Sequence, residues 1–227
     1  ESGKEELAEN LEKCRTRAGI VLADVSGHEA LDALLALMLH QAFLLGAAYE
    51  LDCYGDITTT LFEKLNTRFY RSSATSKYLT LLYGEISESG RFRFISAAHP
   101  IPVVFSSRLD RFVDISDHSV ITFPPIGMIP SFEDIDRNAH HTVLGFKEGY
   151  EVNELTLMST GDILILYTDG LSDHERESES YFPQRLEKFL RRTKTCTARE
   201  IFYAVKSDIE SFAQPSDDIS LVIIKRQ

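Results

Sequence analysis

Hydrophobic positions along the chain follow two different periods, which separate helical from extended segments. From Glu29 onward, apolar residues recur at three- and four-residue intervals, so the pattern predicts a helix in which Leu31, Leu35 and Met38 share a face. The same spacing predicts further helices over residues 57–70, 182–192 and 197–212. We therefore expect four helices after the N-terminal segment.

Short apolar runs between turn-forming residues predict the strands. Extended segments are expected at residues 19–28, 78–87, 91–99, 102–105, 154–170 and 217–226. Ser89-Gly90 makes a hairpin of the second and third segments, and the fifth is expected to be a hairpin that turns at residues 160–162. Residues 106–150 form an irregular excursion, and long loops are often functional.

The order of these segments indicates the fold class. Strands and helices occur in clusters and do not alternate as in βαβ units, which favours an α+β fold with two antiparallel sheets packed on each other and helices outside. The run Ile163–Tyr167 is apolar on both faces, as expected of a strand covered on both sides. The charged residues 1–18 are read as a surface helix or a mobile leader. The chain lacks an initiator Met, so we expect a fragment of a longer protein.

The composition of the chain argues against several classes of function. The chain has 24 Lys and Arg against 35 Asp and Glu, and no basic stripe with interleaved aromatic residues, which argues against nucleic-acid binding. Three widely spaced cysteines, Cys14, Cys53 and Cys196, indicate a reducing compartment such as the cytoplasm and no thiolate metal site. The most apolar region, residues 30–49, contains Asp32, His40 and Gln41, so it is read as a buried amphipathic helix and not as a membrane span.

Acidic residues stand at the ends of three strands that the pattern predicts to be buried. Asp24 ends the first, Asp169 follows Ile163–Tyr167, and Asp217-Asp218 precedes the last. A carboxylate beside a hydrophobic strand is costly unless its charge is neutralised, and a divalent cation such as Mg²⁺ or Mn²⁺ neutralises converging carboxylates well. A single Asp-Gly after a strand is an ordinary turn, and spacing alone leaves open whether the three ends converge.

Five motifs in a fixed order resemble a known family: "ADVSGH", "AAHPIPVVF", "PPIGM", "GDILILYTDGLSD" and "SDDISLVII". Together they resemble the SpoIIE/RsbU branch of the metal-dependent protein phosphatases, the PPM or type 2C-like family. The resemblance covers about residues 19–226 and implies that residues 19–227 form one PPM-type domain, an α/β/β/α sandwich of two antiparallel sheets flanked by helices. It also implies two Mn²⁺ or Mg²⁺ ions, with a third, weaker one, and hydrolysis of phosphoserine or phosphothreonine.

The resemblance assigns roles residue by residue. Asp24 resembles the bridging metal ligand and Val25 the residue whose backbone carbonyl follows it, while Asp169 resembles the ligand of the Asp-Gly motif. Asp217 matches the first acid of the last motif, Asp218 stands where many relatives have Asn, and Asp173 resembles the acid that holds a further metal. The catalytic set implied is Asp24, Asp169 and Asp217, acting through a metal-activated water.

The chain departs from the family pattern in three places. The resemblance implies an earlier strand with a Gly-Gly-Asp motif, and that motif is not found upstream of Gly19. Glu29 replaces the usual glycine after "GH" and adds negative charge near the site. Ser26 stands where eukaryotic relatives have a His, which leaves His28, with His99 of "AAHP", as the histidines expected near substrate.

The leading hypothesis is therefore a serine/threonine phosphoprotein phosphatase. The resemblance implies a phosphorylated anti-sigma-factor antagonist of the STAS type as substrate, in a bacterial partner-switching pathway. It also implies an upstream sensor or membrane module and a homodimer. Two alternatives stay open: a catalytically silent regulatory module that lacks one metal ligand, and a metal-dependent hydrolase of small phosphoesters.

Overall fold

The computed structural model describes residues 2–25, 27, 30–72, 78–115, 120–131, 149–156 and 159–227. The chain forms two compact units. The first comprises residues 1–99 and 121–154, and the second comprises residues 100–120 and 155–227. Each unit contains one main sheet and its own helices, so each is described by itself.

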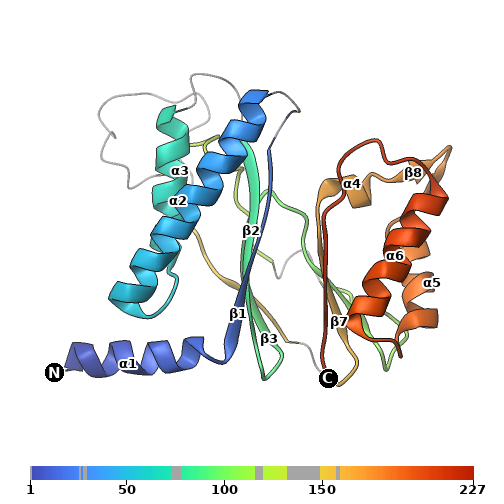
Figure 1. Ribbon diagram of the computed structural model, residues 1–227, viewed down its shortest axis with the longest axis horizontal. Coiled ribbons are helices and arrows are strands. Elements are labelled where there is room, and N and C mark those ends of the chain that lie inside the picture. Colours follow the sequence, from blue (N-terminus) through green and yellow to red (C-terminus); the bar gives the residue numbers. More distant parts are fainter. Residues whose placement is uncertain are drawn as a thin grey trace. The chain divides into compact units, whose positions relative to one another are not determined.

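The first unit contains a sheet with the strand order β1-β2-β3-β6 (Figure 1). Its elements are α1 (Ser2–Cys14), β1 (Arg17–Val25), α2 (Ala30–Tyr54), α3 (Thr59–Ser72), β2 (Leu79–Ser87), β3 (Arg91–Ala97) and β6 (Asn153–Thr156). β1 and β2 pair antiparallel along their whole length, and the predicted hairpin at Ser89-Gly90 joins β2 to β3. Gly90 has a φ of 85°, a value that favours glycine at this turn.

Helices α2 and α3 supply the core of the first unit (Figure 1). The predicted apolar face of α3 is buried through Leu61, Phe62, Leu65 and Phe69. These side chains pack with residues of α2, β2 and β3: Leu39, Phe43, Ala47, Leu79, Leu81, Tyr83, Ile95 and Ala97. The core therefore fixes the position of β2. The pairing of β1 with β2 in turn fixes the register of β1.

Two expectations about burial in this unit are wrong. β1 was predicted to be a buried strand, but only Leu22 is buried, because β1 is the end strand of its sheet. Residues 30–49 were predicted to form a buried amphipathic helix, but α2 is apolar on every side and buries only one face. α2 also meets the length and hydropathy criterion for crossing a membrane, a criterion that core helices and signal sequences meet too.

The second unit contains a sheet with the order β10-β7-β4-β5. Its elements are β4 (Val103–Ser106), β5 (Arg111–Phe112), β7 (Ile163–Tyr167), α4 (Asp169–Ser172), β8 (Glu175–Arg176), β9 (Glu179–Ser180), α5 (Gln184–Thr193), α6 (Ala198–Phe212) and β10 (Leu221–Lys225). All five residues of β7 are buried, as the sequence predicted. Ile163, Ile165 and Tyr167 pack against α5 and α6, which cover this side of the sheet (Figure 1).

Two further predictions need correction in this unit. Residues 154–170 do not form a hairpin, because β6 joins the sheet of the first unit while β7 pairs with β4 and β10. The turn at Thr160–Gly161 is present, with Gly161 at a φ of 89°. The last strand is shorter than predicted and only half-buried, because β10 is the end strand of its sheet.

The predicted fold class is confirmed: the chain is α+β, with two antiparallel sheets and flanking helices. Much of the predicted excursion, including residues 116–119 and 132–148, lies outside the described residues. The charged N-terminal segment forms helix α1, which contacts α2 and β1 within the first unit.

Candidate functional site

Two of the predicted acidic motifs meet at one end of the β7–β10 pair. These strands are antiparallel, with Tyr167 opposite Leu221. Asp169 follows the end of β7, and Asp217-Asp218 precedes the start of β10. The antiparallel pairing therefore brings both motifs to the same edge of the second sheet.

Thr168 ties the two motifs together through its backbone and its hydroxyl. Its N–H donates to the carbonyl of Ser220 at 3.2 Å. Its Oγ1 donates to the carbonyl of Asp218 at 3.3 Å and accepts from the N–H of Ser220 at 2.9 Å. The Thr168 side chain is buried, so water competes little for these hydrogen bonds. Sequence reasoning did not single out Thr168, although its place in "YTDG" could have drawn attention to it.

Gly170 allows the two segments to approach closely. A Cβ atom at this position would lie 2.3 Å from the carbonyl oxygen of Asp218, which is a backbone atom and cannot swing aside. Glycine has no Cβ atom, so it is the residue that fits this contact. The contact places the backbone of the Asp-Gly motif directly against that of Asp218.

The acidic side chains of the second unit face solvent. Asp169, Asp173, Asp217 and Asp218 are all exposed. The N–H of Asp173 donates to the carbonyl of Asp169 at 2.8 Å, so the one-turn helix α4 fixes the spacing of these two acids. The N–H of Asp218 donates to Oδ1 of Asp217 at 2.8 Å, which restrains the Asp217 carboxylate.

His174 stabilises the end of α4, and sequence reasoning did not single it out either. It is buried, its Nε2 lies 3.2 Å from the carbonyl of Ile209, and its ring packs against Tyr181 and Phe212. Because His174 directly follows Asp173, this packing anchors the end of α4 to α6. A buried histidine between charged residues gives no pattern that the sequence alone reveals.

The remaining predicted ligands, Asp24 and Val25, belong to the first unit. Asp24 is half-buried near the end of β1 and lies opposite Thr80 of β2. Thr80 Oγ1 lies 3.1 Å from Nδ1 of His99, and Ser96 Oγ donates to the carbonyl of His99 at 2.8 Å. His99 is therefore held at the same end of the sheet as Asp24, with its side chain buried.

The predicted ligand set is thus divided between the two units. Asp24 and Val25 lie in one, and Asp169, Asp173, Asp217 and Asp218 lie in the other. In the part of the chain that the structure describes, no three His, Cys, Asp or Glu side chains gather into a group that could hold a metal ion. Ser26, His28 and Glu29 lie outside the described residues, so the role predicted for His28 stays a prediction.

Comparison with known proteins identifies the family. The family described as stage II sporulation protein E (SpoIIE) matches residues 15–227. The chain belongs to the SpoIIE family. This confirms the resemblance that the five motifs carry, to the SpoIIE branch of the PP2C-type phosphatase domains.

Individual relatives of this SpoIIE-family domain are similar to it in sequence or in structure. It is 29% identical over 158 residues to the phosphoserine phosphatase RsbP of Bacillus subtilis, a match that covers 69% of this chain and 34% of RsbP. The domain thus spans about a third of the length of that relative. The solved structure of the RsbU and RsbW domains of Rv1364c from Mycobacterium tuberculosis superposes with a TM-score of 0.63 at 20% identity, covering 93% of this chain and 52% of that one.

A third relative shows the fold together with its metals. The catalytic domain of the serine/threonine protein phosphatase PstP, solved in complex with two manganese ions, has a TM-score of 0.51 to the SpoIIE-family domain. The identity is 12%, with 92% of this chain and 89% of that one covered. At this identity the likeness supports the fold: two antiparallel sheets with flanking helices.

Proposed function

We propose that the domain hydrolyses phosphoserine or phosphothreonine in a protein substrate and that it requires Mn²⁺ or Mg²⁺. The observation that carries the proposal is the junction of the Asp169 and Asp217-Asp218 motifs through Thr168 and Gly170. Membership in the SpoIIE family, the phosphoserine phosphatase RsbP and the manganese complex of PstP support the same reading.

The donor set suits a hard divalent cation. Asp169, Asp173, Asp217 and Asp218 offer carboxylate oxygens, which Mg²⁺ and Mn²⁺ prefer. Among the described residues, no Lys or Arg forms an ion pair with any of these four acids. Uncompensated carboxylates on adjoining turns repel each other, and a bound cation would relieve that repulsion.

The chain's own residues position the proposed ligands. Asp24, the carbonyl of Val25, Asp169 and Asp217 would hold two ions, with Asp218 beside them and Asp173 holding a further, weaker ion. Such ions supply an activated water and stabilise charge on the phosphoryl oxygens. Thr168 and Gly170 fix the backbone from which Asp169 and Asp218 project, and this rigidity favours a preorganised site.

The substrate that we propose is a phosphorylated STAS-type anti-sigma-factor antagonist. The names of RsbP and of the RsbU and RsbW domains support a role in partner switching. The proposal includes a cytoplasmic location, an upstream sensor or membrane module, and a homodimer as the functional form. The predicted substrate contacts of His28 and His99 belong to this proposal as well.

A second candidate function is a silent regulatory module. Residues 2–14 form helix α1 immediately before β1, so the Gly-Gly-Asp strand implied by the resemblance is not among the described residues there. If one metal ligand is lacking, the domain would bind a partner protein without hydrolysing a phosphoester bond in it.

Release of phosphate from a phosphoserine protein, assayed with and without Mn²⁺, distinguishes these readings. We expect Mn²⁺-dependent release that Asp169→Asn abolishes and that Asp114→Asn, an exposed acid of the same unit, leaves unchanged. Full activity in Asp169→Asn would contradict the two-metal assignment. Calorimetry without Mn²⁺ binding would favour the silent module, and faster turnover of nucleotides or sugar phosphates than of phosphoproteins would favour a small-molecule hydrolase.

A further inference from the structure

A long trough separates β1 from α2 in the first unit. It is a cavity of 640 Å³, within the range of about 300–1,000 Å³ typical of small-molecule sites. Gly19, Val21, Ala23 and Val25 alternate along β1 and therefore line one wall. The facing wall belongs to α2 and includes Phe43 and Leu44.

Small side chains keep this trough open and leave apolar surface accessible. Gly19 and Ala23 on β1 and Ala36 on α2 fill little of the space between the two elements. Val21 is 38% exposed and Leu44 is 49% exposed. Because a strand rises about 3.3 Å per residue, the wall from Gly19 to Val25 is about 20 Å long. A linear apolar chain matches this shape better than a compact ring system.

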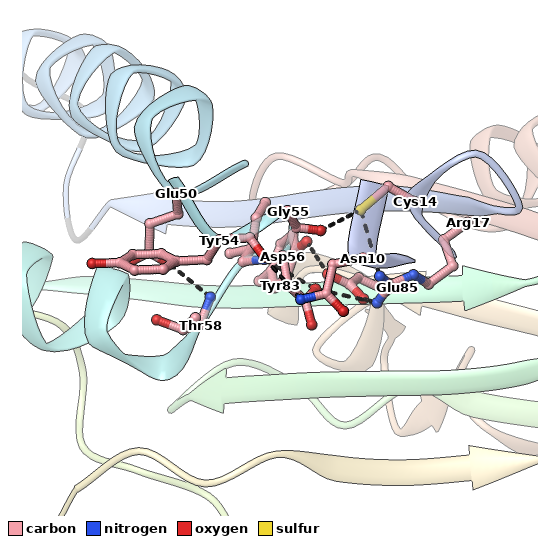
Figure 2. A network of polar contacts seen from close by, with 11 residues as sticks. Asn10, Cys14, Arg17, Glu50, Tyr54, Gly55, Asp56, Thr58, Tyr83 and Glu85 are labelled. Carbon is pink, nitrogen blue, oxygen red and sulfur yellow. Dashed lines mark hydrogen bonds and ion pairs between the residues drawn. The ribbon is translucent and has the colours of Figure 1, made fainter. Parts of the chain in front are cut away.

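One end of the trough is polar. There the guanidinium of Arg17 bonds Oε2 of Glu85 at 2.7 Å and Oδ1 of Asp56 at 3.2 Å (Figure 2). The hydroxyl of Tyr83 donates to Oε1 of Glu85 at 2.6 Å, and Cys14 lies beside Arg17 (Figure 2). Figure 2 shows these side chains, from α1, β1, β2 and the segment after α2, converging on one point.

The charge at this end is negative. Burial and the hydrogen bond to Glu85 raise the pKa of the Tyr83 phenol, and burial raises that of the Cys14 thiol, so both stay neutral near pH 7. Among the described contacts, the Arg17 guanidinium pairs with two carboxylates, so these three side chains together carry a net charge of about −1. A cation is favoured here and an anion is disfavoured.

We propose that the trough binds an elongated amphiphile with an alkyl chain and a cationic amine. The chain lies between β1 and α2, and the amine lies beside Glu85, whose partner Arg17 also binds Asp56. The same strand ends at Asp24 and Val25, so an occupant that orders β1 also acts on the candidate metal ligands. This last consequence rests on the proposed phosphatase activity, whereas binding itself does not.

Calorimetric titration with three twelve-carbon probes, each kept below the concentration at which it forms micelles or separates from water, tests the proposal. Dodecylamine, dodecanol and dodecanoate share one chain and differ in the charge of the head group. At pH 7 we expect the amine to bind at least about tenfold more tightly than the carboxylate, with the alcohol between them. Equal affinities for the three, or no binding of the amine, would overturn the proposal.

Variants locate the binding. Ala23→Phe fills the trough from an exposed position on β1 and should abolish binding, while Leu45→Ala, on a side chain of α2 that is 72% exposed and outside the trough, should not. Asp56→Asn removes one negative charge. It should reduce the ratio of amine affinity to carboxylate affinity by about threefold or more. Thermal melts confirm that each variant is folded. Binding that survives Ala23→Phe, or falls equally in Leu45→Ala, would show adsorption to the helix surface and contradict the assignment.

Discussion

Gly170 and Thr168 hold the candidate site together more directly than the acids do. Gly170 packs against the backbone of Asp218, and Thr168 bonds the residues on either side of Ile219. The acids themselves project into solvent and make few contacts with the rest of the unit. Substitutions at these two positions therefore separate the stability of the site from its chemistry.

Gly170→Ala should destabilise the domain by about 1–3 kcal/mol, because its Cβ would overlap a backbone carbonyl that cannot rotate away. The shift should also displace Asp218 and reduce Mn²⁺ affinity. Urea unfolding and Mn²⁺ titration measure both effects. Gly3→Ala is the contrasting control, since a Cβ there meets nothing within 4 Å and alanine favours helix α1, so this change should not destabilise the domain. A Gly170→Ala protein with wild-type stability and metal affinity would show that the close approach has no role.

Thr168→Val keeps the shape of the side chain and removes its hydroxyl. The Ser220 N–H then loses its acceptor and the Asp218 carbonyl loses a donor, so we expect a loss of about 1–3 kcal/mol in the free energy of unfolding. Thr168→Ser, which keeps the hydroxyl, should retain most of the stability. Equal unfolding midpoints for Thr168→Val and the wild-type domain would contradict this role of the Thr168 hydroxyl.

Single residues also show what sequence reasoning can reach. Asp169 and Asp217 were predicted because acids at strand ends are conspicuous in a one-dimensional pattern. Thr168 and His174 were missed because their partners, Ser220 and Ile209, are distant in sequence and give no local signal.

At the scale of elements, α5 and α6 are joined by a pair whose charge depends on pH. Burial opposes ionisation of Asp208, but the hydrogen bonds from Arg185 at 2.9 and 3.1 Å outweigh it and hold the pKa of this carboxyl below its usual range. A depressed pKa means that the folded state binds this proton less readily than the unfolded state does. The resulting stability is present above about pH 4 and is lost as the pH falls through the folded pKa.

Asp208→Asn should therefore destabilise the domain at pH 7 and have little effect near pH 2. Urea unfolding of both proteins across this range measures the difference. Asp114→Asn, an exposed acid of the same unit, serves as the control. A difference that stays constant with pH would show that the carboxylate charge does not stabilise α5 against α6.

Most elements could be predicted from periodicity, but their assignment to sheets could not. The turn at residues 160–161 was predicted correctly, yet β6 and β7 join different sheets, because sheet membership depends on partners far along the chain. β1 looked buried because its residues are apolar, and its end position in the sheet exposes them. α2 looked amphipathic, although only the packing against α3 and β1 shows which face is buried.

At the scale of the whole molecule, the proposed metal site draws on both compact units. Asp24 and Val25 come from the first, and Asp169 and Asp217 come from the second. A site of this kind could not be derived from spacing alone, because no local pattern relates strands that belong to different sheets. The ordered motifs suggested the grouping, which stays a prediction.

The central claim is that Asp24, Asp169 and Asp217 share divalent cations. A crystal soaked in Mn²⁺ and measured at the manganese absorption edge tests this most directly, because anomalous scattering locates each ion independently of activity. The account predicts two strong peaks in direct contact with carboxylate oxygens of all three residues. The absence of such peaks, or peaks confined to Asp169 and Asp217 with Asp24 uninvolved, would contradict it.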